Sequence, residues 1–448
     1  MKHKFLIKTL LFLFIPYFGI SQQDSSINLS VNQALEYAIQ NNSNIQNAKI
    51  DVIIADKKVW ETTAIGLPQI DVTGSYYNNL SLATQLIPAE FFGGEPGTFA
   101  EIQFGTKHNF NGTLTVSQLI FNGSYLVGLQ AAKIYRSFSE KNLNKTEIET
   151  KATVASTYYT ILLAQENLQI LQENFKNIQE ISRQSNAMAE TGFIEDIEAD
   201  KLKITVGSLE NSIKSLQRQI DFLYMMFKIQ LGINKEQSIV LTDNLNDILL
   251  KININELLEK EFIVEEQADY QIVKTQEDLM ALDVKRYKSE YLPSLSAFYN
   301  FQENAMRNDF NPLDSEEKWF ESSMLGFQIN IPVFNSGLKR SKLQQAQLEL
   351  KKVSNTKSVL ESNLYSLLLQ KRNEFITGQE TLENALGNMQ ISKKVLNNIS
   401  IKHQKGLASS LELTQANSDY LTTVSEYTQS VVTLLNAKIE LEKILNNL

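Results

Sequence analysis

The sequence predicts a mainly α-helical fold in which long coiled-coil hairpins alternate with four β-strands, and this whole arrangement occurs twice. Three observations predict it. Apart from Pro16, the prolines gather in two windows, about 67–97 and 293–332, and leave long tracts free for helices. Apolar residues in those tracts recur at alternating steps of three and four. Residues near the prolines instead alternate between apolar and polar.

The first 21 residues have the pattern of a secretory signal peptide. Three lysines precede the apolar run at residues 10–15, and the small residue Ser21 stands where a signal peptidase cleaves. The alternative, an N-terminal membrane anchor, needs about 20 apolar residues, and this run is shorter. We therefore expect an exported chain that begins at residue 22.

Composition disfavours several classes of function. The chain contains no cysteine, so it has no disulfide and no thiol chemistry. Its formal charge of −9 becomes −12 when residues 1–21, with three lysines and no acid, are removed, and nucleic acid is then a poor partner. His108 and His403 lack metal-ligand spacing, and no nucleotide-binding or nucleophile motif occurs. We expect no catalytic residue, no metal and no cofactor.

The periodic tracts predict two short helices and one long helix in each half of the chain, and spacing sustained over so many turns indicates coiled coils. The expected helices cover residues 33–65, 125–190 and 195–231 in the first half and 256–290, 338–404 and 408–447 in the second. In both halves the two short helices together match the long one in length. This indicates two short helices stacked end to end beside one long helix.

Each half also contains two predicted strands, because a proline followed by strict alternation places every second side chain on one face. The strands cover residues 68–78, 110–121, 293–302 and 324–334, with loops at 79–109 and 303–323. One apolar face, one polar face and aromatic ends are typical of a membrane barrel. The alternative is a soluble hairpin on a helical body. Four strands cannot close a barrel, so a barrel requires two, three or four copies of the chain.

Matched local motifs indicate an internal duplication. The motifs are Leu67-Pro68 with Leu292-Pro293, Phe121-Asn122-Gly123 with Phe334-Asn335-Ser336-Gly337, and Gly192 with Gly406. We therefore expect a signal peptide at 1–21, a first repeat at 22–254 that ends in a linker at 232–254, and a second repeat at 255–448.

With these motifs in this order, the chain resembles the TolC family of outer-membrane efflux and secretion channels over residues 29–448. The resemblance implies a homotrimer whose 12 strands form one outer-membrane barrel, continued by an α-helical tube in the Gram-negative periplasm. The implied partners are further copies of the chain, outer-membrane lipid, a periplasmic adaptor and an inner-membrane transporter of RND, ABC or MFS type.

The function implied by the resemblance is that of an exit duct. Its cargo is small molecules such as drugs or metals, or proteins, and efflux and protein secretion both stay open. The competing interpretation is an exported coiled-coil protein, structural or adhesin-like. That interpretation does not explain why strands interrupt the heptads at equivalent places in both halves.

The resemblance also places carboxylates around a narrow periplasmic mouth. The family's positions six and nine residues after the second tip glycine are Glu412 and Gln415 here, and Glu198 stands six residues after Gly192. The alternative for the two glutamates is an ordinary solvated acid on a helix.

Two glycines are expected to turn the helical hairpins at the periplasmic tip, since glycine favours the left-handed conformation that ends many helices. At Gly192 and Gly406 the next residues, Phe193 and Leu407, offer apolar contact to an adaptor. The alternative is that the glycines only shape the turns. One turn before Gly406, His403 is a candidate pH-sensitive residue that gains charge as the pH falls toward about 6.5.

Overall fold

The computed structural model describes residues 26–311, 314 and 316–448, so the predicted signal peptide lies outside the described residues. The chain forms two compact units, each assembled from segments far apart in sequence. The first unit takes the chain up to Asn42 together with Lys151–Ile254 and Gly378–Asn436, and the second takes Ser43–Thr150, Asn255–Thr377 and Ala437–Leu448. Among the described residues, no helix is both long enough and apolar enough to cross a membrane.

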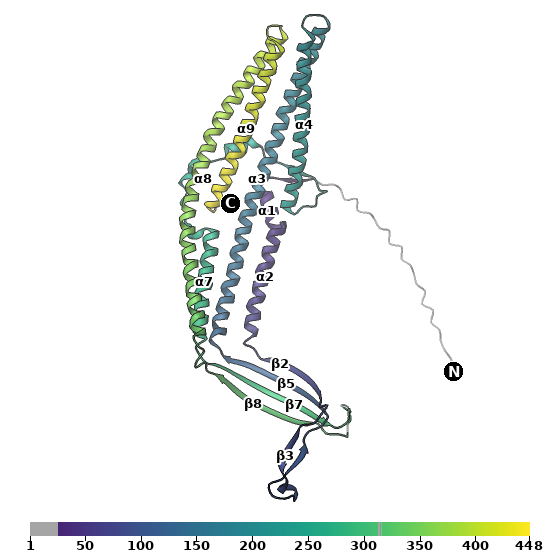
Figure 1. Ribbon diagram of the computed structural model, residues 1–448. Coiled ribbons are helices and arrows are strands. Elements are labelled where there is room, and N and C mark those ends of the chain that lie inside the picture. Colours follow the sequence, from purple (N-terminus) through teal and green to yellow (C-terminus); the bar gives the residue numbers. More distant parts are fainter. Residues whose placement is uncertain (1–25, 312–313, 315) are drawn as a thin grey trace, which may run out of the picture. The chain divides into compact units, whose positions relative to one another are not determined.

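Two long helices contribute to both units, and each is followed by a shorter helix (Figure 1). Helix α3 covers Gly123–Glu190 and α8 covers Leu338–Gln404. The shorter helices that follow are α4 (Asp196–Leu231) and α9 (Ser410–Ile444). Each long helix therefore forms an antiparallel hairpin with its successor, in the order expected from the two repeats.

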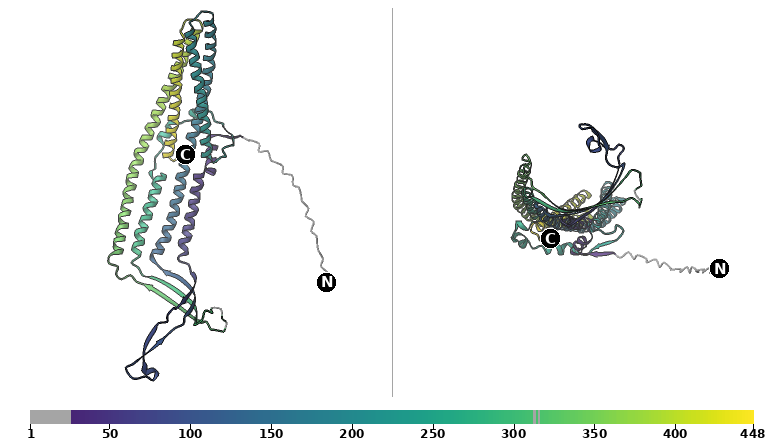
Figure 2. Two further views of the ribbon diagram at one scale, coloured as in Figure 1. Left: turned by 45° about the vertical axis from the view of Figure 1, so that its right-hand side comes forward. Right: turned by 90° about the horizontal axis from the view of Figure 1, so that it is seen from below.

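The second unit contains a four-stranded antiparallel sheet at the end of its helices (Figures 1 and 2). Its strands are β2 (Gln69–Asn78), β5 (His108–Phe121), β7 (Ser294–Arg307) and β8 (Phe320–Asn330), in the order β2-β5-β7-β8. The two repeats meet in the centre of the sheet, where β5 pairs with β7. In the described chain, β2 and β8 each pair with one strand of this sheet, so both are edge strands.

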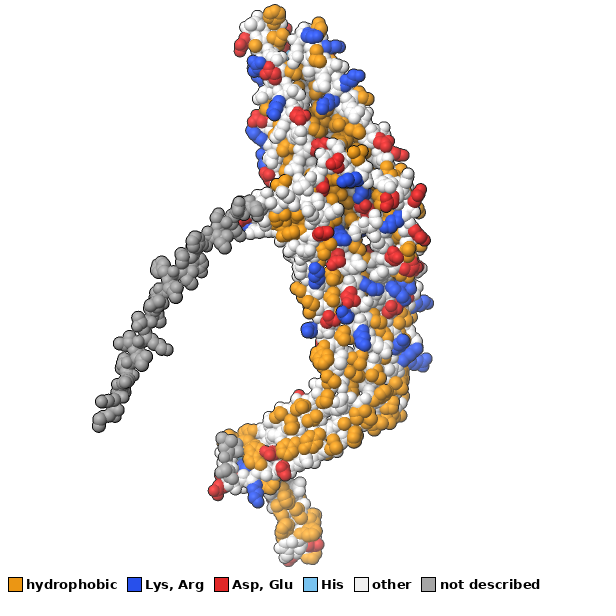
Figure 3. Space-filling model, turned by 180° about the vertical axis from the view of Figure 1, so that it is seen from behind, with side chains coloured by type: hydrophobic (Ala, Val, Ile, Leu, Met, Phe, Trp, Pro, Cys, Tyr) orange, Lys and Arg blue, Asp and Glu red, His pale blue; other side chains and the backbone are white. Residues whose placement is uncertain are grey.

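The register separates the sheet into an apolar face and a polar face. On the apolar face, one row across the four strands reads Ile70, Val116, Tyr299 and Leu325. Residues directly opposite each other in antiparallel strands share a face. The apolar side chains of this face gather in the hydrophobic area over the strands in Figure 3. Ile70 is 68% exposed and Leu325 is 71% exposed, so within one chain this face is uncovered.

In the second unit, two helices lead into strands of the sheet through short connections. Helix α2 (Ser43–Ala64) leads into β2 past Gly66, and α7 (Ala268–Ser289) leads into β7. A Cβ atom on Gly66 would lie 2.2 Å from the hydroxyl oxygen of Tyr125. That hydroxyl donates a hydrogen bond to the carbonyl of Thr63 at 3.2 Å. Gly66 therefore allows α3 to pack directly against the end of α2.

Two helices that the sequence predicted as continuous are interrupted. The helix expected at 33–65 is divided into α1 (Val31–Asn41) and α2, because Asn42 adopts an extended backbone. Its side chain instead donates to the carbonyl of Gln230 at 2.6 Å. Gly232, with a φ of +71°, also packs here, and a Cβ on it would lie 2.3 Å from the carbonyl oxygen of Asn41. The apolar spacing within residues 33–65 does not indicate these contacts, because Gln230 and Gly232 lie far away in the sequence.

The helix expected at 256–290 is interrupted in the same way. It consists of α6 (Ile254–Glu259), the 3-10 turn η2 (Val264–Glu266) and α7. Buried Gln267 lies at the break in an extended conformation and donates to the carbonyl of Ile444 at 2.6 Å. The break therefore satisfies a free carbonyl at the end of α9.

The structure adds two strand pairs that the sequence analysis missed. In the first unit β1 (Ile27–Leu29) runs parallel to β6 (Ile239–Leu241), which precedes α5 (Leu245–Leu250) inside the expected linker. In the second unit, the loop expected at 79–109 contains β3 (Thr84–Pro88), η1 (Ala89–Phe92) and β4 (Phe99–Gln103). The four strands of the main sheet are therefore not the only strands of the chain.

Tyr158 anchors the parallel pair of the first unit to α3. Its side chain is fully buried, and its hydroxyl oxygen lies 3.0 Å from the carbonyl of Leu29 and 2.8 Å from the carboxylate of Asp243. Burial, and then the bond to Asp243, raises the pKa of the Tyr158 hydroxyl. The same carboxylate accepts the backbone N–H of Val31 at 2.7 Å, at the start of α1.

We expect Tyr158→Phe to lower the stability of the protein by about 1–3 kcal/mol, because it removes the hydroxyl's bonds to Leu29 and Asp243 and leaves the part-buried backbone N–H of Asp243 without its acceptor. The measurement is the thermal unfolding midpoint of the purified protein in detergent, followed by circular dichroism. Tyr135→Phe is the matched control on the same helix, since the Tyr135 side chain is 45% exposed. Equal midpoints for the two variants would contradict the anchoring role.

Candidate functional site

The two hairpins of the first unit end in turns of the same geometry. Gly192 has a φ of +77° and Gly406 a φ of +72°, the left-handed region in which glycine carries no Cβ penalty. The N–H groups of Gly192 and Phe193 donate to the carbonyls of Ala189 and Met188, both at 2.9 Å. The turn after α8 repeats this pattern with Gly406 and Leu407 as donors. Both are helix-ending motifs that satisfy the last free carbonyls.

Large apolar side chains project from both turns. Phe193 is 81% exposed and Leu407 is 74% exposed. Four residues further on, in the first turns of α4 and α9, Ile197 and Leu411 are 58% and 62% exposed, so each tip carries a pair of exposed apolar residues. Only the first member of each pair was predicted from the sequence as a contact residue. The second members were detectable, because their four-residue spacing from Phe193 and Leu407 is the same in both repeats.

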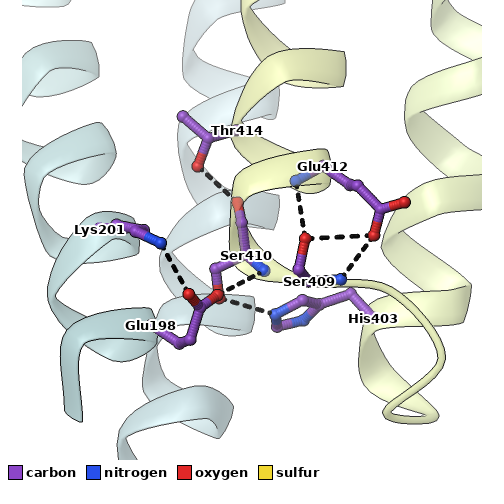
Figure 4. A network of polar contacts seen from close by, with 7 residues as sticks. All are labelled: Glu198, Lys201, His403, Ser409, Ser410, Glu412 and Thr414. Atoms are coloured by element: carbon purple, nitrogen blue, oxygen red, sulfur yellow. Dashed lines mark hydrogen bonds and ion pairs between the residues drawn. The ribbon is translucent and has the colours of Figure 1, made fainter. Parts of the chain in front are cut away.

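Glu412 lies in the first turn of α9, where it closes a capping box with Ser409 (Figure 4). The backbone N–H of Ser409 donates to Glu412 Oε2 at 2.8 Å, and the N–H of Glu412 donates to Ser409 Oγ at 3.2 Å. The backbone and side-chain bonds from Ser409 lower the pKa of this carboxyl. Glu412 is exposed, so it is a solvated anion at neutral pH.

Glu198 has a different environment, although it holds the equivalent position in the first repeat. Its carboxylate accepts the backbone N–H of Ser410 at 2.9 Å and pairs with Lys201 at 2.7 Å (Figure 4). The bond from Lys201, and to a smaller extent those from Ser410, lowers the pKa of the Glu198 carboxyl. Glu198 therefore joins the start of α4 to the start of α9, and its side chain is 24% exposed.

His403 is buried beside this link. Its Nε2 lies 3.1 Å from the hydroxyl oxygen of Ser410. Burial lowers the pKa of His403 below its ordinary value of 6.5, and the nearby charge of Glu198 opposes that shift only in part. The expectation that His403 gains charge near pH 6.5 therefore needs correction, since the change occurs at a lower pH.

Gln415 lies on the exposed side of α9, where its amide donates to Asp419 at 2.8 Å. Glu412, Gln415 and Asp419 follow one another at spacings of three and four, so they share one exposed stripe of the helix. The sequence analysis missed Asp419. Asp419 follows Gln415 by four residues in the sequence, whereas the resemblance implies only the positions six and nine residues after Gly406.

An apolar core holds the two hairpins together below the tips. Its buried members come from α3, α4, α8 and α9 and include Ile178, Leu202, Leu396, Leu413 and Tyr420. A buried amide pair crosses this core, with Asn174 donating to Asn417 at 2.7 Å. The tips are therefore presented by a packed four-helix body. Within the described part of the chain, no group of three or more acidic or histidine side chains could hold a metal ion.

Solved structures of outer-membrane channels share this fold. CusC has 17% identity and a TM-score of 0.72 over 93% of this chain and 91% of its own. CmeC of Campylobacter jejuni has 17% identity and a TM-score of 0.70 over 93% and 85%. MtrE of Neisseria gonorrhoeae has 14% identity and a TM-score of 0.68 over 93% and 88%. No curated protein sequence matches the chain.

The family model for outer membrane efflux proteins matches residues 34–221 and 269–447, so the chain belongs to that family. The resemblance, the mainly helical duplicated fold and the outer-membrane location expected from the sequence are confirmed. A homotrimer with a barrel and a helical tube is consistent with the family. Members are channels and not enzymes, which also removes the adhesin-like alternative.

We expect Glu198→Ala to accelerate hydrogen exchange at the Ser410 amide by about ten-fold or more, since a hydrogen bond to a charged acceptor contributes about 1.5–3 kcal/mol. Exchange measured by mass spectrometry on peptides that contain Ser410 tests this. Glu210→Ala is the matched control, because Glu210 pairs only along α4 with Lys214 in the described structure. Unchanged exchange at Ser410 in Glu198→Ala would remove the proposed link.

The link should also depend on pH. Because the pKa of Glu198 is lower in the folded protein than its ordinary value of 4.5, its contribution to stability is complete above that value. It is lost as the pH falls through the lower, folded pKa. Protection of the Ser410 amide, corrected for intrinsic exchange, should therefore persist at pH 5 and above.

Proposed function

We propose that this protein is the outer-membrane exit duct of a tripartite export system. The observation that carries the proposal is the two-faced sheet with an unpaired strand at each edge. In lipid, an unpaired edge leaves backbone N–H and C=O groups without partners, at several kcal/mol for each group. Pairing β8 of one copy with β2 of the next satisfies these groups and extends the sheet.

The number of copies follows from the family and the strand count. Three copies supply 12 strands, which lies within the range of known membrane barrels, whereas four strands alone do not close. The apolar row that contains Ile70 and Leu325 then contacts lipid, and the polar face lines the channel. The helical hairpins continue the channel into the periplasm as a tube.

We further propose that the hairpin tips dock a periplasmic adaptor, which connects the tube to an inner-membrane transporter of RND, ABC or MFS type. The exposed residues Phe193 and Leu407, placed by Gly192 and Gly406, support this role. Exposed apolar side chains that project from rigid turns favour contact with a partner. The cargo would be small molecules such as drugs or metals, or proteins, chosen by the transporter.

The periplasmic mouth is proposed to be lined by Glu412, Gln415 and Glu198. The exposed carboxylate of Glu412 supports a ring of like charges, which favours cations over anions in a narrow pore. The Glu198 carboxylate accepts the backbone N–H of Ser410, so its contribution to such a ring is smaller. His403 would act on this region only at acidic pH, when it gains charge beside Glu198.

The topology predicts that loop residues between the paired strands face the exterior. Glu95→Cys and Asp314→Cys should react on intact cells with a maleimide coupled to a polymer too large to enter the channel, while Glu198→Cys should react only after the outer membrane is opened. The chain has no native cysteine, so every signal comes from the introduced residue. The same cells should yield a trimer that dissociates on heating in gel electrophoresis. Labelling of Glu198→Cys on intact cells, or a monomer before heating, would refute the proposal.

The docking role predicts that Phe193→Ser combined with Leu407→Ser abolishes export while trimers still assemble. Both changes keep the tip glycines and remove only the exposed apolar contact. Sensitivity to exported compounds and cross-linking to the adaptor give the readouts. Phe222→Ser, at a 63% exposed position of α4 away from the tip, is the control and should export normally. Normal export by the double variant would dismiss the docking surface.

A further inference from the structure

The polar face of the main sheet carries a single charged residue. The strand residues on this face belong to rows such as Asp71, Thr115, Asn300 and Met324, which lie opposite one another across the sheet. The remaining positions on this face hold hydroxyl, amide, glycine, methionine, leucine and aromatic side chains. Asp71, in β2, is therefore its only acidic or basic side chain.

All other acidic and basic residues of the four strands belong to the apolar side. Glu303 lies opposite Glu321 in β8 and opposite Gly112 in β5, which in turn lies opposite Gly74 in β2. Gly74 is three positions from Asp71, so this row is on the other face of the sheet. His108 lies opposite Arg307 and two positions from Phe110, a residue of the same face. Asp71 and the other charged residues of the four strands therefore lie on opposite faces of the sheet.

Asp71 is exposed, and its row contains no basic residue that could neutralise it. We propose that Asp71 determines the charge selectivity of the barrel, so that cationic and neutral polar solutes pass more readily than anionic ones. This proposal rests on the proposed function, because closure of three copies is what brings three Asp71 carboxylates around one lumen.

The size of the effect follows from the width of the barrel. Twelve strands spaced about 4.8 Å apart and tilted by about 40° enclose a radius of about 12 Å. A carboxylate that points inward therefore lies about 10 Å from the axis. The Debye length is about 30 Å at 0.01 M salt and about 3 Å at 1 M. Three such charges should enrich monovalent cations on the axis about four-fold at 0.01 M and hardly at all at 1 M.

Reversal potentials of single trimers in planar bilayers under a KCl gradient test the proposal. Asp71→Asn should lower the ratio of cation to anion permeability several-fold at low salt and leave it unchanged at 1 M. Asp71→Lys should shift the ratio further, toward anions. Glu303→Gln is the matched control, since it removes an exposed acid from the opposite face of the same sheet. Glu412→Gln, alone and with Asp71→Asn, separates the barrel from the periplasmic mouth.

A second measurement locates the side chain directly. In the cysteine-free background, Asp71→Cys and Ile70→Cys place a thiol on opposite faces at adjacent positions. A cationic, water-soluble thiol reagent should modify only Asp71→Cys and should shift its selectivity toward anions. Ile70→Cys, facing lipid, should not change.

The outcomes separate this inference from the proposed function. If the wild-type protein forms no trimeric channel, the proposed function fails. If channels form but Asp71→Asn and Asp71→Lys keep the wild-type selectivity at low salt, Asp71 is not a selectivity determinant. Equal effects of Asp71→Asn and Glu303→Gln would likewise overturn the inference, since a general surface-charge effect would then explain both.

Discussion

The unpaired edges of the main sheet are the constraint on which the rest of the structure depends. Strands β2 and β8 each leave a row of backbone groups without partners in the described chain, and lipid offers these groups no hydrogen bonds. A single copy is therefore incomplete as a membrane protein. The duplication supplies the geometry needed for closure, because β5 and β7 pair in the centre and leave one edge strand from each repeat free to meet another copy.

Local patterns in the sequence predicted the long helices, the four main strands and the tip glycines. Each depends on residues close in sequence: a period of two or 3.6, or a glycine that allows a positive φ. The interruptions at Asn42 and Gln267 were not predictable in this way. Asn42 bonds to a carbonyl 188 residues away and Gln267 to one 177 residues away. When a helix ends because a side chain bonds a distant carbonyl, its apolar period continues up to the break and so does not indicate it.

In the candidate site, too, features that depend on neighbouring residues were predictable and features that depend on distant contacts were not. The exposure of Phe193 and Leu407 follows from their places beside turning glycines. The link from Glu198 to Ser410 joins residues 212 apart and depends on the packing of four helices, so no local pattern could indicate it. The lower pKa of His403 comes from its burial, which the residues next to it in sequence do not indicate.

The two tips share a backbone but differ in how their helices begin, and this difference explains the role of Glu198. In the second repeat Ser409 and Glu412 form a capping box, which holds the Glu412 carboxylate on its own helix. The equivalent of Ser409 in the first repeat is Glu195, which makes no side-chain cap and has no hydroxyl to offer. Glu198 has no such partner at the start of its own helix. Its carboxylate instead accepts the N–H of Ser410. The second repeat has Ser409 where the first has Glu195, and with this difference the glutamate three residues later forms a bond between hairpins in place of a local cap.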